Sequence, residues 1–231
     1  GGSDGTVRMW NREGKPIGQP FKGHQGLVNS VAISTKTRTI VSGGSDGTVR
    51  MWNREGKPIG QPFKGYQGIV NSVAISTNGQ TIVSGSSDGT VMMWNHQGQQ
   101  IGQPFKGHAG GVRSVAISTD GRTIVSGGSD GTVRMWNREG KQIGQPFQGH
   151  QGSVTSIAIN THEQTIVSGE FDGTVRMWNR EGKQIGQPFQ GHQGPVTSVA
   201  ISTDGRTIVS GGFDGTVRMW NREGKQIGQP F

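Results

Sequence analysis

The segment SDGTVRMWN at residues 45–53 returns, with at most one substitution, at five other places in the chain. Its aspartate stands at positions 4, 46, 88, 130, 172 and 214, so each copy follows the last after 42 residues. The 231 residues therefore hold 5.5 periods with no insertion. A fixed period of about 40 to 45 residues indicates a repeat architecture in which each unit contributes four short strands and their turns.

One period, read from His24, alternates apolar runs with turn residues. Apolar stretches at 27–34, 39–42 and 48–53 are separated by short polar segments, which are typical of tight strand connections. A fourth stretch at 59–63 contains Pro62, which a sheet tolerates at its edge, where no partner needs the N–H. No stretch shows helical periodicity. We therefore predict an all-β chain, a β-propeller of four-stranded antiparallel blades.

The repeat register divides this single propeller domain into unequal parts. Residues 1–23 supply only the two outer strands of a blade, whereas residues 24–231 supply five complete blades. A half-blade would expose strand edges and apolar faces, which favours aggregation. Two arrangements remain open: the chain is a segment of a longer repeat protein, or two or more copies associate to complete each other.

Each complete blade also carries a Gly-His-type pair, followed about twenty residues later by Asp-Gly and then by a Trp six residues after that Asp. This order resembles the WD-repeat (tryptophan–aspartate repeat) β-propeller family, in its highly repetitive bacterial type. In that family the His, the Asp, the Trp and a Ser or Thr two residues before the Asp form a hydrogen-bonded tetrad. The resemblance implies structural roles for His24, Asp46, Trp52, Ser86, Asp88, Trp94, His108, Asp130, Trp136, His150, Asp172, Trp178, His192, Asp214 and Trp220.

The tetrad implied in this way is incomplete. The residue two before the Asp is glycine in three blades, Ser86 in the second and Glu170 in the fourth, and Tyr66 replaces the histidine of the second blade. We expect His–Asp contacts in the other four blades. The indole N–H of each Trp needs a partner when buried, and we expect that partner to be water or backbone.

Differences between the copies concentrate at three positions of the repeat. The first lies just before the first strand, three residues after the histidine position. The second lies two residues after the first, and the third lies directly before the turn aspartate. On the family's geometry these positions lie at one end of the propeller, where partners commonly dock. We therefore predict a surface that binds a protein or a peptide, with random drift after duplication as the alternative. The predicted contact residues are Leu27, Asn29, Ile69, Asn71, Arg113, Ser153, Thr155, Phe171, Pro195, Thr197 and Phe213.

Composition and motifs argue against most kinds of chemistry. The chain has no cysteine, which rules out disulfides and thiolate metal sites, and it contains neither a nucleophile elbow nor a phosphate-binding loop motif. Each regularly placed histidine has an aspartate in its own blade, so we expect no metal and no cofactor. The net charge of +8 comes from Lys and Arg that recur around the ring, which argues against a nucleic-acid partner. No apolar run reaches the roughly 18 residues of a membrane helix.

The sequence therefore predicts a non-enzymatic interaction scaffold or sensor array in the cytoplasm, of the kind found in signalling proteins. Self-association through the half-blade is a further prediction. Two other functions remain open: a lectin-like propeller that binds carbohydrate, and a designed or recently amplified repeat protein with no specific ligand.

Overall fold

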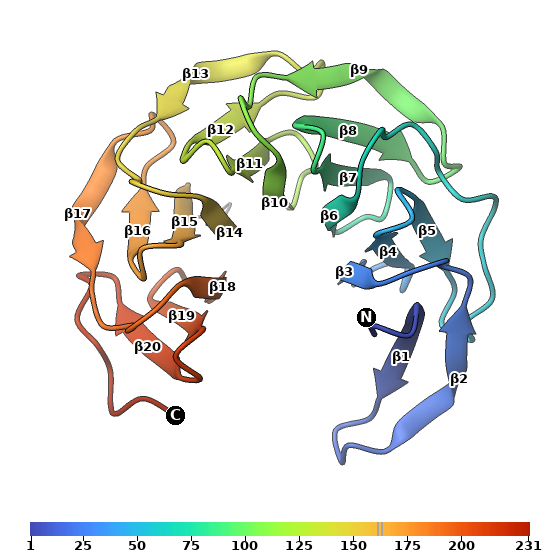
Figure 1. Cartoon of the computed structure of the whole chain (residues 1–231), viewed down its shortest axis with the longest axis horizontal. Helices are drawn as coiled ribbons and strands as arrows, with labels where there is room; N and C mark the ends of the chain where they lie inside the picture. Colours follow the sequence, from blue (N-terminus) through green and yellow to red (C-terminus); the bar gives the residue numbers. More distant parts are fainter. Residues whose placement is uncertain (161, 163) are drawn as a thin grey trace.

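The computed structural model describes residues 1–160, 162 and 164–231. Its strands form separate antiparallel sheets that follow one another around a circle (Figure 1). Blade 1 contains β3 (Val28–Ile33), β4 (Ile40–Gly44) and β5 (Val49–Trp52), and blade 2 contains β6 (Val70–Ile75), β7 (Thr81–Ser86), β8 (Thr90–Asn95) and β9 (Gln100–Lys106).

The next three blades repeat this order. Blade 3 contains β10 (Val112–Ile117), β11 (Ile124–Gly128), β12 (Val133–Trp136) and β13 (Gln142–Phe147). Blade 4 contains β14 (Val154–Asn160), β15 (Thr165–Glu170), β16 (Val175–Trp178) and β17 (Gln184–Phe189), and blade 5 contains β18 (Val196–Ile201), β19 (Thr207–Gly212) and β20 (Val217–Asn221). A two-stranded sheet of β1 (Thr6–Trp10) and β2 (Pro16–Lys22) precedes blade 1.

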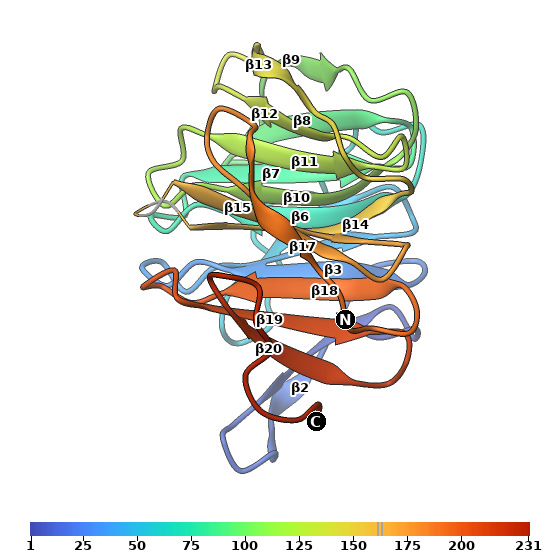
Figure 2. The same ribbon diagram turned by 90° about the vertical axis from the view of Figure 1, so that its left-hand side faces the viewer.

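The blades form a β-propeller, as the repeat predicts. The first strand of each blade faces the centre of the circle, and the later strands lie progressively further out (Figure 1). Seen from the side, the strands run roughly along the axis of the circle, so the loops gather at its two ends (Figure 2). The circle is open between β20 and β1, with the two chain termini on either side of the opening (Figure 1).

The fourth segment of blades 1 and 5 differs from the prediction of a regular strand. In blade 1 it stays beside β5 through hydrogen bonds from Ile59 N to Met51 O at 2.9 Å and from Phe63 N to Val49 O at 2.8 Å. Such an outer segment has one neighbour only and carries a proline, which cannot donate, and Gly60 at φ +71°. Few ladder hydrogen bonds therefore hold it, and small differences in geometry decide whether it is regular.

The core lies between the blades, where each sheet packs on the next. One apolar cluster joins Val133 and Phe147 of blade 3 to Val154 and Trp178 of blade 4, and the centroids of the Phe147 and Trp178 rings are 5.6 Å apart. The second strand of each inner blade is buried along its whole length because it has a sheet neighbour on each edge and another blade on each face. A blade therefore depends on its neighbours for burial of its apolar area.

Close approach of the blades explains a glycine that recurs in the second strand. A Cβ added at Gly127 would lie 2.5 Å from Cγ1 of Val154 and 3.0 Å from Cγ1 of Ile157 in the next blade. These distances are too short for any side chain, so the inner strands of neighbouring blades require glycine at this point.

Within the described residues, the structure has no helix with the length and apolar character needed to cross a membrane.

Candidate functional site

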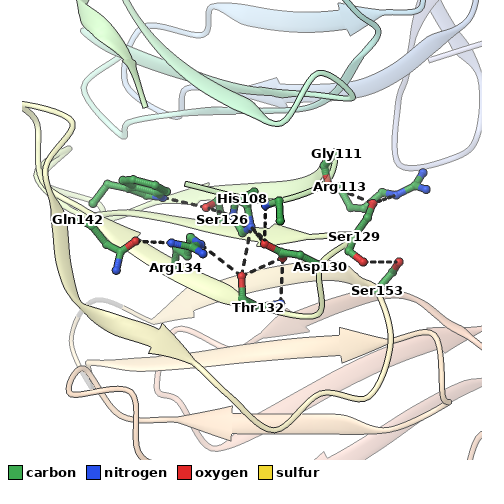
Figure 3. Close-up of polar contacts among 12 residues, drawn as sticks. His108, Gly111, Arg113, Ser126, Ser129, Asp130, Thr132, Arg134, Gln142 and Ser153 are labelled. Carbon is green, nitrogen blue, oxygen red and sulfur yellow. Dashed lines mark hydrogen bonds and ion pairs between the residues drawn. The ribbon is translucent and has the colours of Figure 1, made fainter. Parts of the chain in front are cut away.

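A buried polar cluster links the second and third strands of a blade to the loop before its first strand, and blade 3 shows it most simply (Figure 3). Nε1 of Trp136 donates to Oγ of Ser126 at 2.8 Å, and this Oγ lies 2.7 Å from Nε2 of His108. Nδ1 of His108 lies 3.0 Å from Oδ1 of Asp130. The four side chains therefore form one continuous run of hydrogen bonds from the core to the loop at the end of the blade.

The indole fixes the direction of these hydrogen bonds because it can only donate. Oγ of Ser126 accepts from Trp136 and donates its own proton to Nε2 of His108, and Nδ1–H of His108 donates to Asp130. Burial lowers the pKa of His108 and outweighs the opposite effect of Asp130. The imidazole is therefore kept neutral, which is the form that this run of donors requires.

The carboxylate at the end of the run ties two loops together. In blade 1, Asp46 accepts from Gln25 N at 3.0 Å and from Thr48 Oγ1 at 2.8 Å, and it faces Nδ1 of His24 at 3.0 Å. Burial alone would raise the pKa of Asp46, but the hydrogen bonds from Gln25, His24 and Thr48 hold it at about 2. The loop before the first strand and the loop before the third strand are thus held in one fixed relation.

The serine of this cluster is not the one predicted. In blade 2 the indole of Trp94 donates to Oγ of Ser84 at 2.7 Å, whereas Oγ of Ser86 only accepts from Asp88 N. Trp94 stands opposite Ile82 in the ladder, so the residue two further along, Ser84, is its diagonal neighbour on the same face. The prediction that the Trp N–H binds water or backbone is therefore wrong.

The same serine occurs four residues before the turn aspartate in every blade. Nε1 of each Trp donates to it at 2.7 or 2.8 Å. The serines are Ser42, Ser84, Ser126, Ser168 and Ser210. A signal for them was present in the sequence, because the stretch TIVS that contains them is identical in all five blades.

Blade 2 replaces the histidine with Tyr66 and keeps half of the cluster. The Tyr66 hydroxyl lies 2.6 Å from both the carbonyl oxygen and Oγ of Ser84, and it accepts from Met92 N at 3.2 Å. Burial raises the pKa of Tyr66. The turn residue Asp88 still accepts from Gln67 N at 3.0 Å, and its negative charge adds to the rise in the pKa of Tyr66.

Blade 4 changes the acid. Nδ1 of His150 pairs with Oε2 of Glu170, whose side chain is fully buried, and not with Asp172. The longer glutamate starts two residues earlier and reaches the position that the aspartate carboxylate occupies elsewhere. Asp172 is left on the surface, where it accepts from Thr174 N. The expected His150–Asp172 contact is therefore wrong, whereas Nδ1 of His192 lies 3.1 Å from Oδ1 of Asp214 in blade 5.

The polar clusters hold together the loops that carry the variable residues. In every blade, the residue that precedes the turn aspartate donates its backbone N–H to the carbonyl of the residue just before the first strand, at 2.8 to 3.1 Å. Two of the three variable positions of each repeat are thus joined directly. The donor and acceptor pairs are Ser45–Leu27, Ser87–Ile69, Ser129–Gly111, Phe171–Ser153 and Phe213–Pro195.

A cavity of about 440 Å³ lies at this end, where the first strands of the blades converge. All five blades contribute to its lining, which consists of Asn29, Asn71, Arg113, Ser153, Thr155, Phe171 and Thr197. The remaining predicted contact residues are Leu27, Ile69, Pro195 and Phe213, which lie outside this lining; Leu27, Ile69 and Phe213 are exposed. We call the eleven residues together the variable face.

Four members of the variable face also bridge neighbouring blades, and one of them, Ser153, donates from its Oγ to the Ser129 carbonyl at 3.4 Å. Nδ2 of Asn29 donates to the Val70 carbonyl at 3.0 Å, and Nδ2 of Asn71 donates to the Val112 carbonyl at 2.8 Å. Thr155 makes the corresponding contact with Val196. Sequence reasoning missed this structural role, because a bond to a residue 41 positions away leaves no local pattern.

Arg113 has a different partner. Its Nε donates to Oγ of Ser129 at 2.9 Å, and this hydroxyl donates to the Gly111 carbonyl at 3.1 Å (Figure 3). Arg113 is exposed, and it is the single charged group in the cavity lining. Among the described residues no three His, Asp or Glu side chains gather as a metal site would require.

Comparison with known proteins agrees with this architecture. The family model described as "WD domain, G-beta repeat" matches five times, at residues 14–53, 56–95, 98–137, 140–179 and 182–221. The search of curated proteins found no match. Since the five matches cover most of the chain, the protein belongs to the WD domain, G-beta repeat family.

Proposed function

We propose that this protein is a non-enzymatic interaction scaffold that binds a protein or a peptide on its variable face. Propellers of this family are commonly interaction scaffolds. The observation that carries the proposal is the cavity of about 440 Å³, whose lining draws on every blade and consists of residues from the variable positions. Drift would not be expected to select positions that converge in space. As part of the same proposal we assign the protein to the cytoplasm.

The chemistry of the variable face suits a peptide segment. The donor groups of Ser153, Thr197 and Asn71 bond to backbone carbonyls, so their side-chain oxygens offer acceptor sites at the cavity. Phe171 offers an exposed ring. Arg113 adds one positive charge in a pre-oriented position. A rigid aromatic group and an arginine beside a concave surface are the residues that most often dominate binding energy.

A random-peptide display selection against the whole chain tests this proposal. Peptides recovered on wild-type protein should bind the Arg113→Ala and Phe171→Ala variants at least about tenfold more weakly, because arginine and aromatic anchors dominate such interfaces. Affinities measured by fluorescence anisotropy give the comparison.

Arg122→Ala is the matched control. Arg122 belongs to the same blade, but it lies beyond the other end of β10 and lines a separate cavity of about 390 Å³. Its loss should leave affinity unchanged. Equal weakening by both arginine variants, or by neither, would contradict the proposal. Strong signal on a glycan array without any peptide binding would favour a carbohydrate ligand instead.

A further inference from the structure

The N-terminal sheet presents half of a blade cluster without the other half. In the turn before β1, Oδ1 of Asp4 accepts from Oγ1 of Thr6 at 2.7 Å, as the turn aspartate of blade 3 does from Thr132. In the described part of the chain, however, neither a histidine contact to Asp4 nor a serine contact to the indole of Trp10 is found. The Trp10 side chain is 56% exposed, whereas the other five tryptophans are buried.

A second missing pair involves the same tryptophan. In every pair of neighbouring units a phenylalanine of the outer segment packs on the tryptophan 31 residues later, with centroids 5.4 to 5.8 Å apart. Phe231 is 76% exposed and has no such partner. In a closed ring of six 42-residue units, the position 31 residues after Phe231 coincides with that of Trp10. The two unpaired rings are therefore the members of one missing contact.

The surface beside the half-blade shows which element would cover it. Val31 on β3 is 45% exposed, whereas its equivalent on β6, Val73, is 5% exposed. Val73 is covered by the second strand of the preceding blade, since a Cβ added at Gly43 would lie 2.9 Å from Cγ1 of Val73. Val31 therefore lacks the second strand of a preceding blade.

The other side of the opening is apolar too. Val217 on β20 is 42% exposed, whereas its equivalent Val175 on β16 is fully buried. In blade 4 the covering comes from the inner strands of blade 5, because Val175 shares an apolar cluster with Val196 and Val199. One pair of inner strands placed in the opening would thus cover both sides.

Gly1 and Gly2 fix where this missing element ends. A Cβ added at Gly1 would lie 2.4 Å from Cγ1 of Val28, just as Gly43 lies against Val70 one unit later. Val28 N donates to the Gly2 carbonyl at 3.1 Å. Gly1 and Gly2 therefore already occupy the last two positions of a second strand. The missing hairpin ends at the position directly before Gly1.

A second copy of the chain cannot supply this hairpin. All five pairs of inner strands are already hydrogen-bonded to the third strand of their own blade. Donating one pair would only move the vacancy to another blade. This argument goes against the predicted self-association as the means of completing the half-blade.

We propose that the opening is a docking site for one inner β-hairpin of this same repeat, carried by a polypeptide segment outside residues 1–231. The sequence of residues 190–210, QGHQGPVTSVAISTDGRTIVS, represents such a hairpin. Its histidine would pair with Asp4, its terminal serine would accept from Trp10, and its strands would add to the free edge of β1 and close a six-bladed ring. This inference is independent of the variable face.

The test uses the whole chain and a synthetic peptide of residues 190–210. Titration of the peptide should shift the fluorescence emission of Trp10 to the blue and protect it from acrylamide quenching, with one peptide bound per chain. A peptide with His192→Ala and Ser210→Ala should bind at least about tenfold more weakly, because it leaves buried polar groups of the half-blade unpaired. A chain with Trp10→Phe should bind the peptide without the emission shift.

A covalent version guards against aggregation of the free peptide. Fusing the same 21 residues after Phe231 completes six units of 42 residues and should raise the melting temperature and bury Trp10. The doubly substituted hairpin should raise the melting temperature less. Failure of both the peptide and the fusion to protect Trp10 from quenching would overturn the proposal. It would also be overturned if the unfused chain formed a dimer in light scattering and Trp10 were protected in that dimer.

Discussion

Residues 1–15 and 127–141 have the same sequence, GGSDGTVRMWNREGK, yet they have different environments. In blade 3 the stretch lies between two other blades, and Trp136 is 2% exposed. In the half-blade it forms β1 and the turn that follows, and Trp10 is largely exposed. The strand forms in both places, so its conformation is local, whereas its burial and its polar contacts come from strands elsewhere in the chain.

The largest expected effect comes from removing the same tryptophan at each place. Trp136→Ala should lower the free energy of unfolding by about 3–5 kcal/mol, because it empties a buried site between blades 2 and 3. Trp10→Ala should cost less than about 1 kcal/mol because the ring is already hydrated. Urea denaturation of both variants measures the difference, and equal losses would show that the half-blade is covered in solution.

A smaller effect is expected from the serine that the half-blade lacks. Ser126→Ala leaves Nε1 of Trp136 and Nε2 of His108 without their shared partner, at a cost of about 1–3 kcal/mol. Ser3→Ala is the control, since Ser3 is exposed, and it should change stability by no more than about 0.5 kcal/mol. Thermal unfolding measures the stability of both variants. A Ser126→Ala variant as stable as the wild type would show that the hydrogen bonds of Ser126 do not stabilise the blade.

The smallest effect is expected from acid, and its first step should come from the buried histidines of complete blades. Burial lowers the pKa of His24 and of His108 in the folded protein. The unfolded chain therefore takes up protons at a higher pH than the folded one, so stability is full above about pH 6.5 and falls as the pH decreases below it. The loss is at most about 1.4 kcal/mol per pH unit for each histidine.

A second loss should follow at lower pH. The pKa of Asp46 is held at about 2, below its ordinary value of 3.8, so its contribution is present above about pH 4 and disappears as the pH falls towards 2. Urea midpoints between pH 7.5 and pH 3 measure both steps. His108→Tyr, which copies the natural substitution at Tyr66, should flatten the first step; an unchanged slope would assign it to other groups.

Sequence reasoning predicted the fold well because the signal was repeated. The fixed spacing of Asp46, Trp52 and their copies defined the period, and the alternation of apolar runs with turns gave the strands of each blade. It predicted the polar clusters less well. Ser126 was missed because its role depends on a diagonal neighbour across a ladder, and Glu170 was not recognised as the partner of His150 because side-chain reach decides that pairing.

The site was only partly predictable for the same reason. Comparing the copies identified Arg113 and Phe171 as variable, and the structure brings both to one cavity. The comparison could not separate them from Asn29 and Asn71, whose side chains also bridge to the next blade. Variation between repeats marks exposed or adaptable positions, whereas the contact that a side chain makes depends on the neighbour that the fold places beside it.

The sequence alone determined the period, the strands and the residues that alternate towards the core, because these follow from local spacing and turn chemistry. Only the tertiary structure decided which identical residues are buried, which serine completes the cluster and what remains open beside β1. A propeller blade gains most of its stabilising contacts from its neighbours, so the same fifteen residues take one environment inside the ring and another at its open end.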